Sequence, residues 1–186
     1  RGMGCQIDLS NPQHRFSLTI DGASSQIACG WMVGGDAGSD GVATRKATQR
    51  PFFKPVSLSP RLALLAVNLA GCPRQHGPII DAMSGTGGFI MEAAATNRQA
   101  LGIDLSSEMV AGANQNLKWL LEQQKITESS AQIVRGDATN IEASIDKSWV
   151  GEVQGFVLDP PYGRNSQGSL SHDDLLTKTL TSEHRV

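Results

Sequence analysis

Four aspartates and one glycine-rich turn are the residues of this chain with the clearest capacity for chemistry. The turn comprises Ser84, Gly85, Thr86, Gly87 and Gly88, and an apolar segment that begins at Phe89 follows it. A turn without Cβ atoms lets backbone N–H groups approach a ligand, and the start of a helix behind it favours an anion. Many α/β proteins carry such a turn for local reasons, so the turn alone is weak evidence for a nucleotide site.

Each of the four strands predicted after residue 77 ends in an aspartate. The predicted strands cover residues 78–81, 99–104, 131–137 and 155–159. The aspartates are Asp81, Asp104, Asp137 and Asp159. Helical patterns alternate with these strands, at 89–95 and 108–124, which predicts a parallel sheet with crossover helices. Ligands of such sheets bind beyond the carboxyl ends of the strands, so we expect all four carboxylates along one edge.

Two of these carboxylates suit a nucleoside. Asp104 lies about twenty residues beyond the glycine turn, where a dinucleotide-binding fold places the acid that accepts ribose hydroxyls. This position is compatible with NAD or with the adenosine of S-adenosylmethionine. Asp137, next to Ala138, is placed where a carboxylate could accept an adenine amino group.

The stretch Asp159-Pro160-Pro161-Tyr162 separates these possibilities. The two prolines lack N–H donors and keep their carbonyls as acceptors. These residues would place a carboxylate, a carbonyl and an aromatic ring at one sheet edge, which suits an exocyclic amine. The two acceptors can receive hydrogen bonds from the amine while the ring stacks on the base. Hydride transfer to a nicotinamide has no use for this arrangement. The pattern predicts methyl transfer to nitrogen, although an aromatic residue such as Tyr162 is equally common in a core.

Charge is unevenly distributed along the 186 residues, whose net charge is −2. Residues 41–80 contain six basic residues and no acidic one. Such a block attracts a polyanion or forms a solvated linker. We expect RNA contacts from Arg45, Lys46, Arg50 and Lys54.

The chain is expected to have three parts. Residues 1–35 alternate like short β-strands, residues 36–58 form a basic linker, and residues 59–186 form the α/β domain, which opens with a helix at 59–70. Three separated cysteines and four scattered histidines offer no metal-ligand spacing, so we expect no metal and a reducing cytoplasmic setting. Neither a membrane span nor a signal peptide is expected.

The motifs resemble a known family. Asp81-Ala-Met-Ser-Gly-Thr-Gly-Gly-Phe-Ile-Met-Glu-Ala93 and Asp159-Pro-Pro-Tyr-Gly-Arg-Asn-Ser166 are similar to those of the class I S-adenosylmethionine-dependent tRNA methyltransferases that carry a THUMP domain. The similarity is greatest to the archaeal guanine-N2 group acting on guanosine 10, related to the Trm-eleven type. Arg50-Pro-Phe-Phe-Lys-Pro55 also resembles the segment before the glycine turn in that family. The resemblance covers residues 50–169.

The resemblance implies a Rossmann-like methyltransferase fold, the cofactor S-adenosylmethionine and a tRNA substrate. It implies cofactor contacts at Asp81, Ser84, Gly85, Thr86, Gly87, Gly88, Phe89, Asp104, Leu105, Asp137 and Ala138. It implies that Asp159, Pro160, Pro161 and Tyr162 surround the target amine. Ala82 and Ser84 depart from the family pattern, which has proline and often cysteine there.

The two ends of the chain depart from the family more seriously. Further strands of a full methyltransferase fold, and most of a THUMP domain, are expected to be missing, so residues 1–35 would be a partial THUMP-like segment. A small activating partner subunit, or self-association, would then complete the fold. The competing interpretations are adenine-N6 methylation of RNA or DNA, and a non-catalytic fragment that binds the cofactor or RNA.

Overall fold

The computed structural model of this chain describes residues 13–31, 40–55, 57–71, 77–126, 129–161 and 171–186. Tyr162 and residues 1–12 of the predicted β-rich segment lie outside this part of the chain. The chain divides into two compact units, Arg1–Gly41 and Val42–Val186. Within the described residues, no helix is both long and apolar enough to cross a membrane.

The first unit contains an antiparallel hairpin of β1 (Phe16–Asp21) and β2 (Gln26–Trp31). The turn is stabilised by Asp21, whose carboxylate accepts the N–H of Ala23 at 3.0 Å and the hydroxyl of Ser24. The alternation within residues 1–35 predicted short strands, and these two are present. One hairpin face is apolar and exposed, formed by Phe16, Leu18, Ile20, Ile27 and Trp31.

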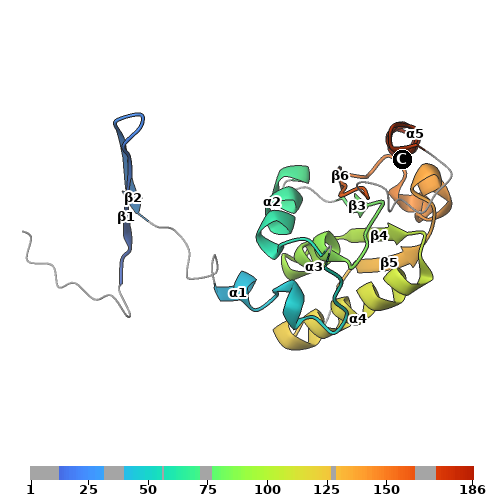
Figure 1. Ribbon diagram of the computed structural model, residues 1–186, viewed down its shortest axis with the longest axis horizontal. Helices are drawn as coiled ribbons and strands as arrows, with labels where there is room; N and C mark the ends of the chain where they lie inside the picture. The colour runs from blue at the N-terminus through green and yellow to red at the C-terminus, as the bar shows by residue number, and fades with distance from the viewer. Residues whose placement is uncertain (1–12, 32–39, 56, 72–76, 127–128, 162–170) are drawn as a thin grey trace, which may run out of the picture. The chain divides into compact units, whose positions relative to one another are not determined.

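The second unit is built on a four-stranded parallel sheet, which confirms the predicted α/β class (Figure 1). Its strands are β3 (Ile79–Asp81), β4 (Ala100–Asp104), β5 (Ala131–Arg135) and β6 (Gly155–Val157). They lie in the order β5-β4-β3-β6. Along the chain, β3 is the first strand of this sheet. The next two strands, β4 and β5, are added on one side of β3, and β6 is then placed on its other side.

Helices cover one face of this sheet. They are α2 (Pro60–Ala70), α3 (Gly88–Ala95) and α4 (Ser107–Gln124). Apolar residues of all three pack with Ile79, Ala100, Ile133 and Val157 in one continuous core cluster. Both α2 and α4 occupy the predicted ranges within one residue, with Pro60 at the first turn of α2 and the Ser106 hydroxyl accepting the N–H of Met109.

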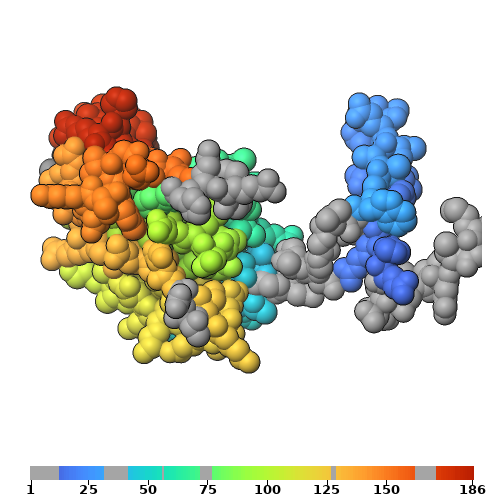
Figure 2. Space-filling model, turned by 180° about the vertical axis from the view of Figure 1, so that it is seen from behind, coloured from blue at the N-terminus to red at the C-terminus, as the bar shows by residue number. Residues whose placement is uncertain are grey.

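The opposite face is covered by two short 3₁₀ helices and one α-helix. These are the 3₁₀ helices η3 (Ala138–Ala143) and η4 (Lys147–Trp149), together with α5 (His172–Glu183), which packs on η3. Ile80, Leu101, Ile103 and Ile141 form the core here. Figure 2 shows α5 in red against the orange region of the chain, which contains η3.

The segment expected to be a linker is largely part of the second unit. It contains α1 (Asp40–Ala43) and the 3₁₀ helix η2 (Ala47–Gln49), and Val42 is buried. The division between the two units falls after Gly41. Residues 42–58 therefore contribute to the fold of the α/β unit.

Candidate functional site at the carboxyl edge of the sheet

The strand order places a topological switch point between β3 and β6, because the chain runs from β3 outward to β4 and β5 and then returns to place β6 on the other side of β3. Ligands of open α/β sheets bind at such a switch point, in a crevice beyond the carboxyl ends of the strands. Asp81 ends β3 and pairs with Gly102 of β4 and Val157 of β6. Asp104 and Asp159 each lie two residues beyond these partners. The charges of both carboxylates act on Asp81, so three of the four predicted acids meet at this edge.

Asp81 is the buried member of this group, with 1% of its surface exposed. Its Oδ1 accepts the N–H of Met83 at 3.1 Å. Burial raises the pKa of the Asp81 carboxyl well above its ordinary value, and the charges of Asp104 and Asp159 raise it further, against the opposing effect of the Met83 N–H. Among the described residues no cation is paired with Asp81, so a cationic ligand group at this edge would interact favourably with its carboxylate.

The glycine turn has the conformation that its sequence predicts. Gly85 and Gly87 have φ values of 49° and 81°, which side chains with a Cβ rarely adopt. A Cβ on Gly87 would lie 3.1 Å from both Ala113 Cβ and Ile133 Cδ1, so close packing also requires glycine there. A Cβ on Gly85 would meet no described atom within 4 Å, so the turn is open to a ligand on that side.

Asp104 connects the glycine turn to the start of α4. Its Oδ2 accepts the N–H of Gly85 at 2.8 Å, and its Oδ1 accepts the N–H of Ser106 at 2.8 Å. These bonds fix the orientation of the carboxylate, and each oxygen keeps a second lone pair. Two neighbouring hydroxyl groups fit this arrangement. The adjacent Leu105 is 63% exposed and offers an apolar surface.

Asp137 follows β5 and lies further from the crevice. Its carboxylate accepts the N–H and the hydroxyl of Thr139, both at 2.8 Å, and caps η3. Asp137 is exposed and Ala138 is buried. At the other end of the site, Asp159 and Pro160 are half-buried and Pro161 is exposed.

A segment that sequence reasoning treated as linker covers the glycine turn. Buried Asn116 on α4 accepts the N–H of Phe52 at 2.9 Å and donates to the carbonyls of Phe52 and Thr86 at 2.9 and 3.0 Å. Thr86 also donates its hydroxyl to Ser57 at 3.2 Å. Sequence reasoning missed Asn116, although one signal was present: an amide within the apolar stripe of α4.

The prediction that the whole basic block contacts RNA is wrong for two of its arginines. Arg45 and Arg50 were expected to contact RNA, but they are only 7% and 4% exposed. Arg45 is held by Glu92 of α3, with Nε–Oε1 at 2.9 Å and Nη2–Oε2 at 2.7 Å, because a fully buried carboxylate requires a cation. Lys46 is exposed, and Lys54 pairs with Glu108 at 2.6 Å. RNA contact at these two lysines stays a prediction.

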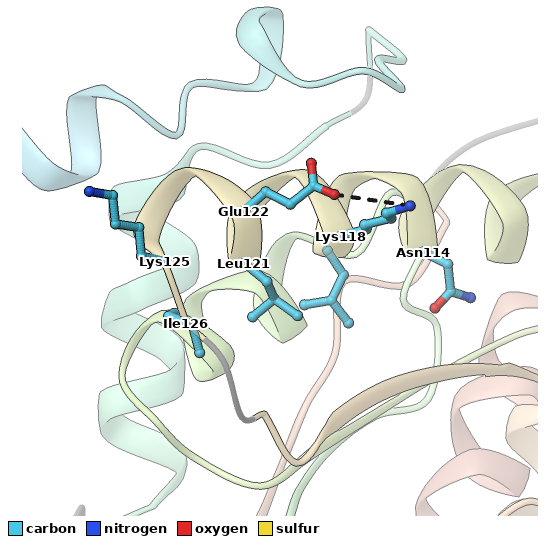
Figure 3. A pocket seen from close by; sticks show the side chains of 7 residues that line it. Asn114, Lys118, Leu121, Glu122, Lys125 and Ile126 are labelled. Carbon is cyan, nitrogen blue, oxygen red and sulfur yellow. Dashed lines mark ion pairs between the residues drawn. The ribbon is translucent and has the colours of Figure 1, made fainter.

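The sheet edge is distinct from a surface depression of about 410 Å³ along α4 (Figure 3). Asn114, Lys118, Leu121, Glu122, Lys125 and Ile126 are among the residues that line it. Lys118 and Glu122 form an ion pair across one helical turn there, at 4.0 Å. None of the residues assigned above to the crevice lines this depression.

A doubly wound parallel sheet with a glycine turn after its first strand and carboxylates at the switch point defines a Rossmann-like nucleotide-binding domain. Residues 47–186 match the family described as UPF0020, RMKL-like, methyltransferase domain. This match covers more than half of the chain, which therefore belongs to that family. The expected fold class is thereby confirmed.

Two curated relatives support the same family. The chain is 35% identical over 143 residues to a tRNA (guanine(10)-N2)-dimethyltransferase of Pyrococcus abyssi, covering 76% of this chain and 40% of the relative. It is 34% identical over 137 residues to the protein of the same name from Methanothermobacter thermautotrophicus, covering 73% of this chain and 37% of the relative. The chain thus spans well under half the length of these relatives.

One solved structure has the same architecture. TrmN from Thermus thermophilus superposes with a TM-score of 0.50 at 19% identity, covering 94% of this chain and 46% of that chain. At this identity the likeness supports the fold alone.

Proposed function

We propose that this chain is the methyl-transferring domain of an enzyme that methylates the exocyclic N2 of a guanosine in tRNA, with guanosine 10 as the target. The observation that carries this proposal is the meeting of Asp81, Asp104 and Asp159 beside an open glycine turn at the switch point. The names of the archaeal relatives support the choice of base and of RNA.

The residues present fit S-adenosylmethionine as the cofactor. The lone pairs left on Asp104 suit the two ribose hydroxyls, and exposed Leu105 suits one face of the adenine ring, with Asp137 and Ala138 near its edge. When bound, S-adenosylmethionine would supply the methyl group from a positively charged sulfonium. The buried carboxyl of Asp81 would then gain a cationic neighbour, which would stabilise its ionised form.

Asp159 and Pro160 are proposed to position the target amine. The lone pair of guanine N2 is delocalised into the ring, so the amine is a poor nucleophile. The Asp159 carboxylate and the Pro160 carbonyl can accept hydrogen bonds from its two N–H groups, and these bonds favour a pyramidal nitrogen. Positioning of this kind can supply a large part of the rate of a transfer reaction.

The substrate also suggests location and partners. A tRNA substrate implies action in the cytoplasm, and exposed Lys46 is a candidate phosphate contact, with Lys54 once its ion pair with Glu108 opens. Because the chain spans 40% of its relative from Pyrococcus abyssi, further chain, a small activating partner subunit or self-association is proposed to complete the enzyme.

Methyl transfer from labelled S-adenosylmethionine to unmodified tRNA transcripts, followed by nucleoside analysis, tests this proposal. We expect labelled N2-methylguanosine, with N2,N2-dimethylguanosine if transfer is repeated. Labelled N6-methyladenosine would instead assign adenine as the base. Cofactor binding with no labelled nucleoside on any RNA would identify a non-catalytic binding domain.

A further inference from the structure

One side of the β1–β2 hairpin is a continuous apolar surface. Directly opposite residues of an antiparallel pair lie on the same side of the ribbon, and side chains alternate between the two sides along each strand. One side therefore carries three opposed pairs, which are Phe16 with Trp31, Leu18 with Cys29, and Ile20 with Ile27. None of these six residues is charged. We call this side the apolar face.

The apolar face is uncovered among the described residues of the first unit. Its five large side chains are between 56% and 70% exposed. The opposite side of the ribbon carries Ser17, Thr19 and Asp21 on β1, which are at ease in water. A two-stranded ribbon is only marginally stable by itself and gains stability when its apolar side packs on another element. The apolar face is therefore the side on which a packing partner is expected.

The size of the apolar face matches that of a protein interface. Large apolar side chains bury about 150–250 Å² each, so the exposed fractions leave about 600 Å² of apolar surface on the hairpin. Two such faces packed together would bury about 1,200 Å², which reaches the range of stable and specific interfaces. A second exposed apolar surface, formed by Leu62, Leu65 and Leu69 of α2, is about half as large and falls short of that range.

The chemistry of the apolar face favours a protein surface over a nucleic acid. Binding of a polyanion needs cations, and this face has none. Its two aromatic rings pack on each other, since the ring centroids of Phe16 and Trp31 lie 5.3 Å apart at an interplanar angle of 76°. A face built of alternating apolar side chains is complementary to a second sheet face, because the side chains of two packed sheets interdigitate.

We infer that the apolar face is a self-association surface, on which the hairpin of a second copy of this chain packs face to face. Both copies present the same opposed pairs, so a twofold dimer satisfies both faces and closes without a surface for a third copy. Leu18 and Cys29 form the middle pair of the face, so the twofold axis would pass close to both copies of Cys29. The inference gives self-association a defined surface and does not depend on the methyl-transfer activity.

Sedimentation equilibrium of the whole chain tests this inference. Wild type should form a reversible dimer with a dissociation constant in the micromolar range. Leu18→Lys places a charge in the middle of the apolar face and should weaken dimerisation at least about a hundredfold, because a buried charge without a partner is costly. Thr19→Lys is the matched control, since it adds the same charge one residue later on the opposite side and should leave the dissociation constant unchanged.

Cross-linking provides a second measurement that leaves the large apolar side chains intact. The chain has three cysteines, so replacing Cys5 and Cys72 by serine leaves Cys29 as the single thiol. A short bis-maleimide should then join two copies through Cys29, because both copies lie close to the twofold axis. Adding Cys29→Ser should abolish the cross-link.

Several results would overturn the inference. A wild type that remains monomeric up to about 100 μM would do so without any variant. Equal effects of Leu18→Lys and Thr19→Lys, or a dimer that is not cross-linked through Cys29, would place the contact elsewhere on the molecule. A lower affinity of Leu18→Lys for unmodified tRNA, with no change in sedimentation, would assign the apolar face to RNA.

Discussion

Asp159 is the residue on which the proposed chemistry depends most directly. It follows the edge strand β6 and is half-buried, and its charge acts on Asp81 across the crevice. Asp159→Ala should lower the rate of methyl transfer at least about a hundredfold, because the amine loses an acceptor. Affinity for the cofactor should change by less than about threefold. Single-turnover kinetics and calorimetry measure the two effects separately.

Asp146→Ala is a suitable control for this variant. Asp146 is an exposed aspartate that accepts the N–H and the hydroxyl of Ser148 before η4, on the face opposite to α3. It should leave both the rate and the affinity unchanged. A parallel fall of rate and affinity in Asp159→Ala would indicate that Asp159 supports the fold of the site.

The burial of Asp81 predicts how folding stability depends on pH. Its ordinary pKa is 3.8, and burial raises the pKa in the folded chain. As pH rises above about 4, the unfolded chain releases a proton that the folded chain keeps, so this group's contribution to folding stability declines. Asp81→Asn removes the titration. The stability of the variant relative to wild type should therefore increase as the pH rises above about 4, as measured by urea unfolding.

Asp146→Asn gives the opposite sign. Hydrogen bonds from Ser148 lower the pKa of Asp146, so its stabilising contribution is present above its ordinary value and is lost only in more acidic solution. Relative to wild type, this variant should show no trend from about pH 4 to pH 7. A flat profile for Asp81→Asn would contradict the assignment of Asp81 as a buried acid at the crevice.

At the scale of elements, α4 and the segment before α2 act together. Asn116 makes three hydrogen bonds that tie Phe52 and Thr86 to this helix. Phe52 also packs on α4, where a Cβ at Gly112 would lie 2.2 Å from its ring. The segment therefore forms a wall of the glycine turn, and the Phe52 ring serves to anchor it.

Asn116→Ala tests this wall. The variant leaves buried backbone groups without partners, so unfolding should become easier by about 2–4 kcal/mol. Affinity for the cofactor should fall as well, because Thr86 loses its support. Asn114→Ala, two residues earlier on the same helix, removes bonds from a more exposed amide to Val110 and Ile133 and should cost about 1 kcal/mol or less. Equal effects of the two variants on binding would contradict the role of Asn116.

At the scale of the whole molecule, the basic block at 41–80 exposes less positive charge at the surface than its sequence indicates. Two of the six basic residues in the block at 41–80 are buried, and Lys54 is paired. If the block binds tRNA, Lys46→Gln combined with Arg61→Gln should reduce the slope of log affinity against log salt by about 1–2. Arg45→Met combined with Glu92→Leu, which removes the buried pair, should leave the slope unchanged. Filter binding at several salt concentrations measures both slopes.

The sheet and its carboxylates could be predicted from sequence because their signals are local. Apolar runs of strand length ending in Asp81, Asp104 and Asp159 indicate parallel strands, and the rule for strand ends brings these acids together. The partner of Arg45 could not be predicted in this way. Glu92 lies 47 residues away from Arg45 in the sequence. An arginine that pairs with a buried carboxylate cannot be told by its residue type from an arginine that contacts RNA. Helix α5 was also missed, although Ser171 caps it and Asp173 and Asp174 occupy its first turn.

The position of β6 beside β3 has a consequence for how the molecule assembles. During synthesis β3, β4 and β5 leave the ribosome before β6, and pairing of strands distant in sequence is slow. The crevice therefore comes into existence only when β6, the last described strand, docks on the first strand of the sheet. A ligand that binds there stabilises the four-stranded arrangement by mass action. Ligand occupancy would thus report that β6 has docked on β3.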